Sequence, residues 1–194
     1  MTGPGVAVAR LAGAQGGPLS AALGSTMETS LVIGVGDGKL GKFPTEYLVT
    51  FALGSCIAVM CYDWKLKIGG LVHIMLPDSS IDKEKAARNP YVFADTGIPA
   101  MFKKLCEAGS SPRSIRSCIA GGAKMLEHSS HFEIGKKNHL AVKRAFWQLG
   151  AFIDREDVGG AESRSVRLDL RTGQVDLRVG GEENQILMGP GRHS

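Results

Sequence analysis

The chain has 194 residues, a hydrophobic content of 43% and a formal net charge of +4. A chain of this length can bury a sizeable core, so one globular domain is expected. The positive charge is small and no segment combines dense Lys and Arg with interleaved aromatic residues, which argues against a nucleic-acid partner. No apolar run reaches about 18 residues, which argues against membrane insertion. A mildly basic surface would suit an acidic protein partner.

Composition divides the chain into three parts. Residues 1–27 are rich in Gly and Ala, lack the basic start and apolar run of a signal peptide, and are typical of a disordered extension. Residues 28–180 carry the regular apolar patterns and form the predicted domain. Residues 181–194 have no clear periodicity and are expected to be a mobile tail.

Four cysteines show neither a metal-binding CxxC spacing nor any sign of export, so we expect reduced thiols in a cytoplasmic protein. Cys61 has the opposite strand parity to Cys56, Cys106 falls on a predicted helix and Cys118 in an apolar strand. These three are predicted to fill structural positions.

A His-x-x-His spacing occurs at His128 and His131, near Glu127 and Glu133. Without further converging ligands this is a weak metal signal. We therefore predict no metal and no cofactor.

Three apolar segments open the domain, at residues 48–53, 56–62 and 68–76, and each is typical of a β-strand. The connection between the second and third strands predicts a hairpin. If its turn is centred between Trp64 and Lys65, Cys56 faces His73. Directly opposed Cβ atoms lie roughly 4.5–5.5 Å apart, so the thiol and imidazole could form a hydrogen bond.

A cysteine beside a histidine can become a thiolate nucleophile, because an imidazolium lowers a thiol pKa that is otherwise about 8.5. Such a pair attacks carbonyl-like carbons. The alternative is that Cys56 is a small buried apolar residue and His73 a satisfied core histidine. The pair by itself leaves both interpretations open.

Two helices are expected after the strands, with residues 78–90 as an exposed loop beside the presumed site. Pro99 would lie in the first turn of the first helix, whose apolar stripe is Ile98, Met101, Phe102 and Leu105. The second helix is predicted at residues 138–149, with Asn138 as its N-cap. Its buried stripe would be Val142, Ala145, Phe146 and Leu149.

The domain ends in a predicted hairpin around Thr172-Gly173, in which Val166 faces Val179 and every apolar residue meets another. Mixed strands and helices in this order indicate an α/β or α+β fold, with antiparallel hairpins forming mixed sheets and helices packed outside.

Five segments carry distinctive motifs: VTFALGSCIAVMCYD, KIGGLVHIMLP, IAGGAKML, FEIGKKN and REDVGG. They resemble the CheD family of chemotaxis proteins, over about residues 31–179. The resemblance implies a CheD-like cysteine-hydrolase fold and deamidation of glutamine side chains on chemoreceptors. The family's catalytic set maps onto Cys56, His73 and Thr50. Trp64 stands where the family often has proline, and IGKKN replaces the commoner IGERN.

The implied chemistry is attack by Cys56, ionised by His73, on the glutamine amide carbon, followed by hydrolysis of a thioester. Thr50 would orient the imidazole. The N–H of Cys56, beside Gly54 and Ser55, is a candidate oxyanion donor.

Two other functions remain as alternatives. A non-enzymatic adaptor would bind methyl-accepting chemotaxis receptors or a CheC-like phosphatase; the intact Thr-Cys-His set argues against an adaptor acting alone. A Cys-His protease or transglutaminase would use the same pair, and the family resemblance argues against it.

Overall fold

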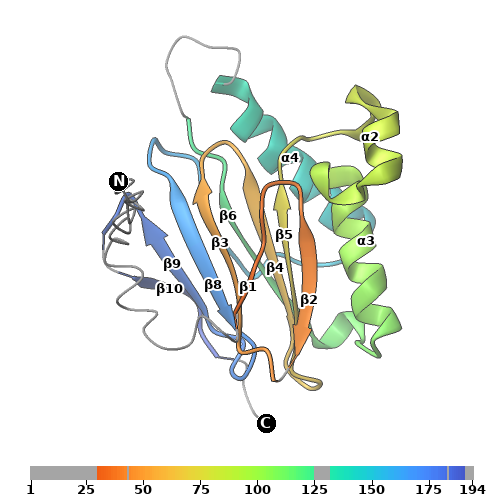
Figure 1. Cartoon of the computed structure of the whole chain (residues 1–194), viewed down its shortest axis with the longest axis vertical. Helices are drawn as coiled ribbons and strands as arrows, with labels where there is room; N and C mark the ends of the chain where they lie inside the picture. Colours follow the sequence, from red (N-terminus) through yellow and green to blue (C-terminus); the bar gives the residue numbers. More distant parts are fainter. Residues whose placement is uncertain (1–29, 43, 125–131, 183, 191–194) are drawn as a thin grey trace, which may run out of the picture.

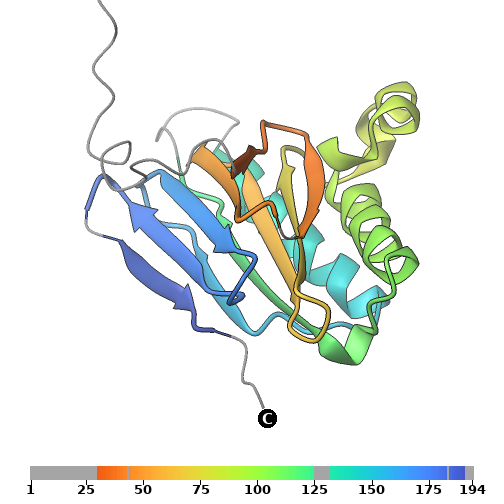
Figure 2. The ribbon, with the colours of Figure 1, turned by 60° about the horizontal axis from the view of Figure 1, so that its bottom comes forward.

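The computed structural model describes residues 30–42, 44–124, 132–182 and 184–190. Two five-stranded sheets face each other, and helices cover the outer face of one of them (Figures 1 and 2). The predicted fold class of mixed sheets with peripheral helices is therefore confirmed. The extension at residues 1–27 and the histidines at 128 and 131 lie outside the described residues.

The first sheet, sheet A, has the strand order β1-β3-β8-β9-β10. Its strands are β1 (Ser30–Val32), β3 (Tyr47–Leu53), β8 (Arg164–Asp169), β9 (Val175–Val179) and β10 (Gln185–Met188). The second, sheet B, has the order β2-β5-β4-β6-β7. Its strands are β2 (Gly38–Lys42), β5 (Ile68–Ile74), β4 (Ile57–Asp63), β6 (Ile115–Gly121) and β7 (Arg155–Val158).

The helical elements follow β5 and β6 in the chain. They are η2 (Ser79–Ile81), α2 (Lys83–Arg88), η3 (Pro90–Val92), α3 (Ala94–Glu107), η4 (Pro112–Ser114) and α4 (Phe132–Gln148). None of the described helices combines the length and apolarity needed to cross a bilayer.

Strand alternation produces two separate cores. On β4, Ile57, Val59 and Cys61 face α3 and α4, because these odd-numbered residues share a core with both helices. Ala58 and Met60 point the other way, into the core between the two sheets. Side chains two residues apart lie on one face of a strand, so parity alone assigns each residue to a core.

The β4–β5 hairpin has a different register from the predicted one. His73 pairs with Ala58, and Asp63 pairs with Ile68, so the connection is four residues long. The Asp63 carboxylate accepts hydrogen bonds from the N–H groups of Lys65 and Leu66, which stabilises this longer turn. The error is two residues, an even number, so Cys56 stays on the same face as His73.

The last hairpin differs in the same way. Val166 pairs with Leu177 rather than with Val179, because the loop before β9 extends from residue 170 to residue 174. The shift is again two residues, and apolar side chains still meet. Beyond residue 180, β10 pairs with β9, so the prediction of an irregular tail is wrong for Gln185–Met188.

The helical region differs from the prediction in four places. Residues 78–90 are exposed as expected, but they form η2 and α2 rather than a loop. Pro99 lies in the second turn of α3, because the helix begins at Ala94. Helix α4 begins before Asn138, which is therefore an interior residue and not the N-cap. The helix also ends before Leu149, which is exposed.

Candidate active site

Thr50 and His73 are brought together between the two sheets. Thr50 lies on β3 of sheet A and His73 on β5 of sheet B, and their side chains are 0% and 1% exposed. Thr50 Oγ1 lies 2.8 Å from His73 Nδ1. The predicted contact between threonine and imidazole is therefore present, across the core rather than along one strand.

The hydrogen bonds determine which ring nitrogen of His73 carries the proton. Thr50 Oγ1 also lies 2.8 Å from the carbonyl oxygen of Ile33, which can only accept. A hydroxyl has one proton, so Thr50 donates to Ile33 and accepts from the N–H at Nδ1. Neutral His73 consequently holds its proton on Nδ1. Its Nε2 is left with a free lone pair, and this buried atom makes no hydrogen bond to any described residue.

Cys56 immediately precedes β4 and is half-buried. It is packed against the core between the sheets, the same side as Thr50 and His73. Since Ala58 pairs with His73, Cys56 is its diagonal neighbour. Diagonal neighbours in an antiparallel pair lie roughly 7–8 Å apart, a separation that a thiol and an imidazole ring can span.

Burial keeps both groups uncharged. Desolvation raises the pKa of the Cys56 thiol and lowers the pKa of His73 to about 4. At neutral pH the site therefore holds a thiol and a neutral imidazole. Because desolvation disfavours both the thiolate and the imidazolium, transfer of the thiol proton to His73 during attack fits this geometry better than a resting ion pair.

The turn that carries Cys56 is held by its carbonyl groups. The carbonyl oxygen of Gly54 accepts from Ala123 N at 2.8 Å, that of Cys56 from Gly122 N at 2.8 Å, and that of Ser55 from Asn138 Nδ2 at 3.0 Å. In a planar trans peptide the next N–H points the opposite way from the carbonyl. The N–H groups of Ser55 and Cys56 are consequently directed away from these anchors.

Local backbone geometry shapes the same turn. Strand β3 contains an irregularity between Thr50 and Leu53, where Ala52 has a φ of +54°. A left-handed conformation costs a non-glycine residue roughly 1–2 kcal/mol. Gly121 has a φ of +122°, and a Cβ at this position would contact the carbonyl oxygen of Cys56. Both features border the Cys56 turn, and no sequence pattern indicates the irregularity at Ala52.

The other three cysteines lie away from this constellation. Cys61 and Cys118 are fully buried in opposite faces of sheet B, and burial raises the pKa of Cys61 to about 12. Their predicted structural role is consistent with this placement. Cys106 is exposed on α3, so the prediction that it fills the core is wrong.

Asn138 is a further residue of the site, and its role was missed because it was assigned to a helix cap. It is buried in α4, and its Nδ2 reaches both the Cys56 turn and the residue after β5. A signal was available in the sequence: Asn138 precedes Val142 and Ala145 by four and seven residues, so it lies on the same helix face as the apolar stripe.

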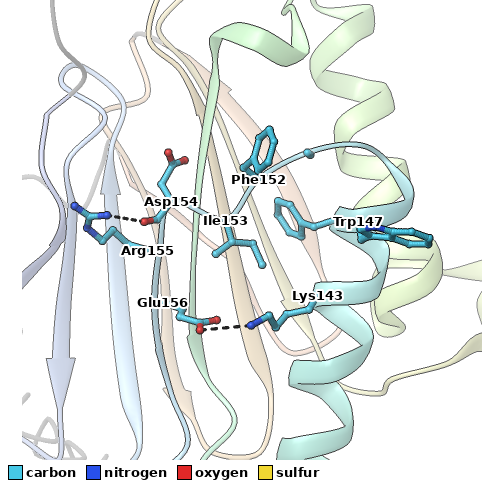
Figure 3. A pocket seen from close by; sticks show the side chains of 9 residues that line it. Lys143, Trp147, Phe152, Ile153, Asp154, Arg155 and Glu156 are labelled. Atoms are coloured by element: carbon cyan, nitrogen blue, oxygen red, sulfur yellow. Dashed lines mark hydrogen bonds and ion pairs between the residues drawn. The ribbon is translucent and has the colours of Figure 1, made fainter.

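The structure also has an open groove of about 510 Å³, but it contains none of the predicted site residues. It lies between the second half of α4 and the segment leading into β7 (Figure 3). Trp147 and Phe152 at its border are 80% and 84% exposed. Lys143 and Glu156 form an ion pair of 3.8 Å across it.

The described site combines a half-buried thiol with a threonine-bound imidazole on a two-sheet α/β scaffold, an arrangement typical of cysteine-dependent hydrolases. The family model for CheD, described as CheD chemotactic sensory transduction, matches residues 75–179, more than half of the chain. The chain belongs to the CheD family.

Several relatives support this assignment over nearly their full length. A probable chemoreceptor glutamine deamidase CheD of Solibacter usitatus is 42% identical over 81% of this chain and 93% of the relative. A probable chemoreceptor glutamine deamidase CheD 1 of Syntrophus aciditrophicus is 43% identical over 78% of this chain and 94% of its own. The crystal structure of the Bacillus licheniformis hypothetical protein YfiH overlaps 64% of this chain and 50% of its own, with a TM-score of 0.36 and 15% identity. That similarity is too low to carry an argument.

Proposed function

We propose that this protein is a chemoreceptor glutamine deamidase, a hydrolase that converts glutamine side chains on chemoreceptors to glutamate. The observation that carries the proposal is the Thr50–His73 hydrogen bond, which leaves Nε2 of the imidazole free on the face that Cys56 shares. Membership of the CheD family, whose relatives above bear this name, supplies the substrate class.

The first step is attack on the glutamine amide. As Cys56 Sγ bonds to the amide carbon, its proton moves to His73 Nε2, and the carbonyl oxygen becomes an oxyanion. The imidazolium then gives this proton to the amide nitrogen, which leaves as ammonia and generates a thioester. Hydrolysis follows the same path: Nε2 takes a proton from water, the resulting hydroxide adds to the thioester carbon, and the sulfur leaves and is reprotonated.

Thr50 supports these transfers by holding Nδ1–H, so that the lone pair on Nε2 is available to accept a proton. The transient imidazolium forms together with the oxyanion, so the two opposite charges stabilise each other in the desolvated site. The N–H groups of Ser55 and Cys56 are the proposed oxyanion donors. Gly54 contributes its carbonyl group to the anchor and not a donor to the oxyanion.

The partners proposed are methyl-accepting chemotaxis receptors as substrates and a CheC-like phosphatase as a binding partner. The reaction is proposed to take place in the cytoplasm, on receptor cytoplasmic domains. The chemistry uses protein groups alone and requires no cofactor.

Mass spectrometry of a receptor cytoplasmic domain tests the function. Conversion of an amide to an acid should raise a glutamine-containing peptide by about one dalton and release one ammonia per site. A Cys56→Ala protein in a parallel incubation is the control. Unchanged receptor masses with the wild-type protein, across receptors from the same organism, would contradict the proposal.

A further inference from the structure

Asn138 contacts two segments of the site at once. Its side chain is 0% exposed on the buried face of α4. Nδ2 donates to the carbonyl oxygen of Ser55 at 3.0 Å and to that of Met75 at 3.0 Å. Ser55 precedes Cys56, and Met75 follows His73 by two residues. One amide group therefore joins the Cys56 turn to the end of the His73 strand.

Among the described residues, no other hydrogen bond joins these two segments beyond the end of the β4–β5 ladder. The β4–β5 pairing ends at Ile57 and Ile74, so the residues before and after it leave the ladder. Both N–H groups of the Asn138 amide donate to carbonyl oxygens, those of Ser55 and Met75. They do so at the level where the next hydrogen bonds of the ladder would have formed. This side chain therefore extends the connection between the Cys56 turn and the His73 strand beyond the end of the ladder.

The backbone of α4 is placed for this contact by Gly135, which lies one turn earlier. A Cβ on Gly135 would meet the carbonyl oxygen of Gly122 at 2.6 Å. Gly122 in turn donates its N–H to the carbonyl oxygen of Cys56. The absence of a side chain at Gly135 lets the helix approach the Cys56 turn closely enough for Asn138 to reach it.

The orientation of the Asn138 amide is set by its partners, because exchanging its nitrogen and oxygen would place Oδ1 against two carbonyl oxygens. In the present orientation Oδ1 is buried and has no hydrogen-bond partner. An unsatisfied buried acceptor is destabilising, so an apolar side chain would suit a purely structural position better. The two bonds to the site segments explain why an amide is present.

We propose that Asn138 is a positioning residue that fixes the distance between the Cys56 thiol and His73 Nε2, and the direction of the Cys56 N–H. The role in turnover rests on the proposed deamidase function. The role in thiol placement does not, and it can be measured without a receptor.

The principal variants are Asn138→Ala, which removes both donors, and Asn138→Asp, which keeps the shape but replaces them with an acceptor. Misplacement of reacting groups by about 1 Å can cost 10²-fold in rate. We expect kcat to fall roughly 10- to 100-fold with KM changed less than about twofold. Alkylation of Cys56 by iodoacetamide at pH 7, read by peptide mass spectrometry, should slow by about 10-fold, since Nε2 no longer takes the proton.

Val142→Ala is the matched control. Val142 lies one turn further along α4, is fully buried, and contacts the same helix-facing core without touching either carbonyl. Measured well below its Tm, this variant should keep both rates within about twofold. Equal losses in Val142→Ala and Asn138→Ala at matched Tm would overturn the proposal, as would Asn138 variants that keep both rates within about threefold.

If the Asn138 variants do not fold, the proposal is tested by NMR of the wild-type protein before and after alkylation of Cys56. The side-chain amide protons of Asn138 should exchange slowly with solvent and shift when Cys56 is alkylated. Fast exchange and no shift would overturn the proposal. A wild-type protein that never deamidates receptors would instead contradict the proposed function, and alkylation and NMR would still report on Asn138.

Discussion

The groove beside α4 and the Thr50–His73–Cys56 site differ in nearly every physical property. The groove is open and lined by exposed aromatic side chains, Trp147 and Phe152, yet it holds no nucleophile. The site has two fully buried polar residues and one half-buried thiol at a strand end. This groove therefore lies apart from the three site residues. Trp147 follows Asn138 by nine residues, about 13 Å along the axis of α4.

The partial exposure of Cys56 suits a macromolecular substrate. A small molecule needs an enclosing pocket, because the protein must supply most of its contacts. A glutamine on a receptor is held by the contacts of the whole receptor surface, so the catalytic groups need only a shallow opening. Cys56 is half-buried immediately before β4, whereas Thr50 and His73, which form the proposed base, are buried.

The largest contrast is expected from Cys56→Ala. Loss of the nucleophile should lower turnover by at least about 10³-fold, because the thioester cannot form. Cys61→Ala and Cys118→Ala should lower Tm without a comparable loss of turnover, since both thiols are buried away from the site. Deamidation is measured by ammonia release at a temperature below every Tm. Residual turnover in Cys56→Ala above about one hundredth of the wild type would remove Cys56 from the mechanism.

Thr50→Val should come next, with turnover reduced by about 10²-fold. The variant keeps a similar shape but loses the hydroxyl that joins His73 Nδ1 to the carbonyl oxygen of Ile33. Leaving buried polar groups unsatisfied should also cost about 1–3 kcal/mol of stability. Thr50→Ser restores the hydroxyl and should recover most of the turnover. If Thr50→Val matches the wild type, Thr50 is only a β-branched strand residue.

The pH dependence of stability and of kcat/KM should be displaced to lower pH than an ordinary histidine would give. The pKa of His73 is lowered to about 4 by burial, from an ordinary value of 6.5. His73 therefore contributes stability that is present above pH 6.5 and is lost as the pH falls towards 4, because the unfolded state binds the proton more tightly. The acid limb of kcat/KM should likewise lie near pH 4. A limb at pH 6 or above, with flat stability between pH 6.5 and 4, would show that His73 is not desolvated.

The smallest effects are expected in the groove. Trp147→Ala and Phe152→Ala remove exposed side chains that contact none of the three site residues. Turnover should stay within about twofold and stability within about 0.5 kcal/mol of the wild type. Receptor deamidation and Tm are measured for both variants beside the Cys56→Ala protein. A clear rise in KM for Trp147→Ala would connect the two regions through receptor docking.

Some features of this protein could be predicted from the sequence because they depend on alternation along a strand. Cys56 and His73 were assigned to one site through the predicted hairpin, and Thr50 was added through the family resemblance. Both predicted hairpin registers were displaced by two residues, yet every face remained correct. An even shift preserves the side to which each side chain points.

Other features were decided by the tertiary structure. Turn lengths depended on local hydrogen bonds, such as those to Asp63, that no periodicity records. The pKa shifts of Cys56 and His73 depend on burial between two sheets whose strands interleave along the sequence. The contact of Asn138 with Ser55 and Met75 spans 83 and 63 residues of chain. Strand patterns report the direction of a side chain, whereas distances and protonation require the packed layers to be in place.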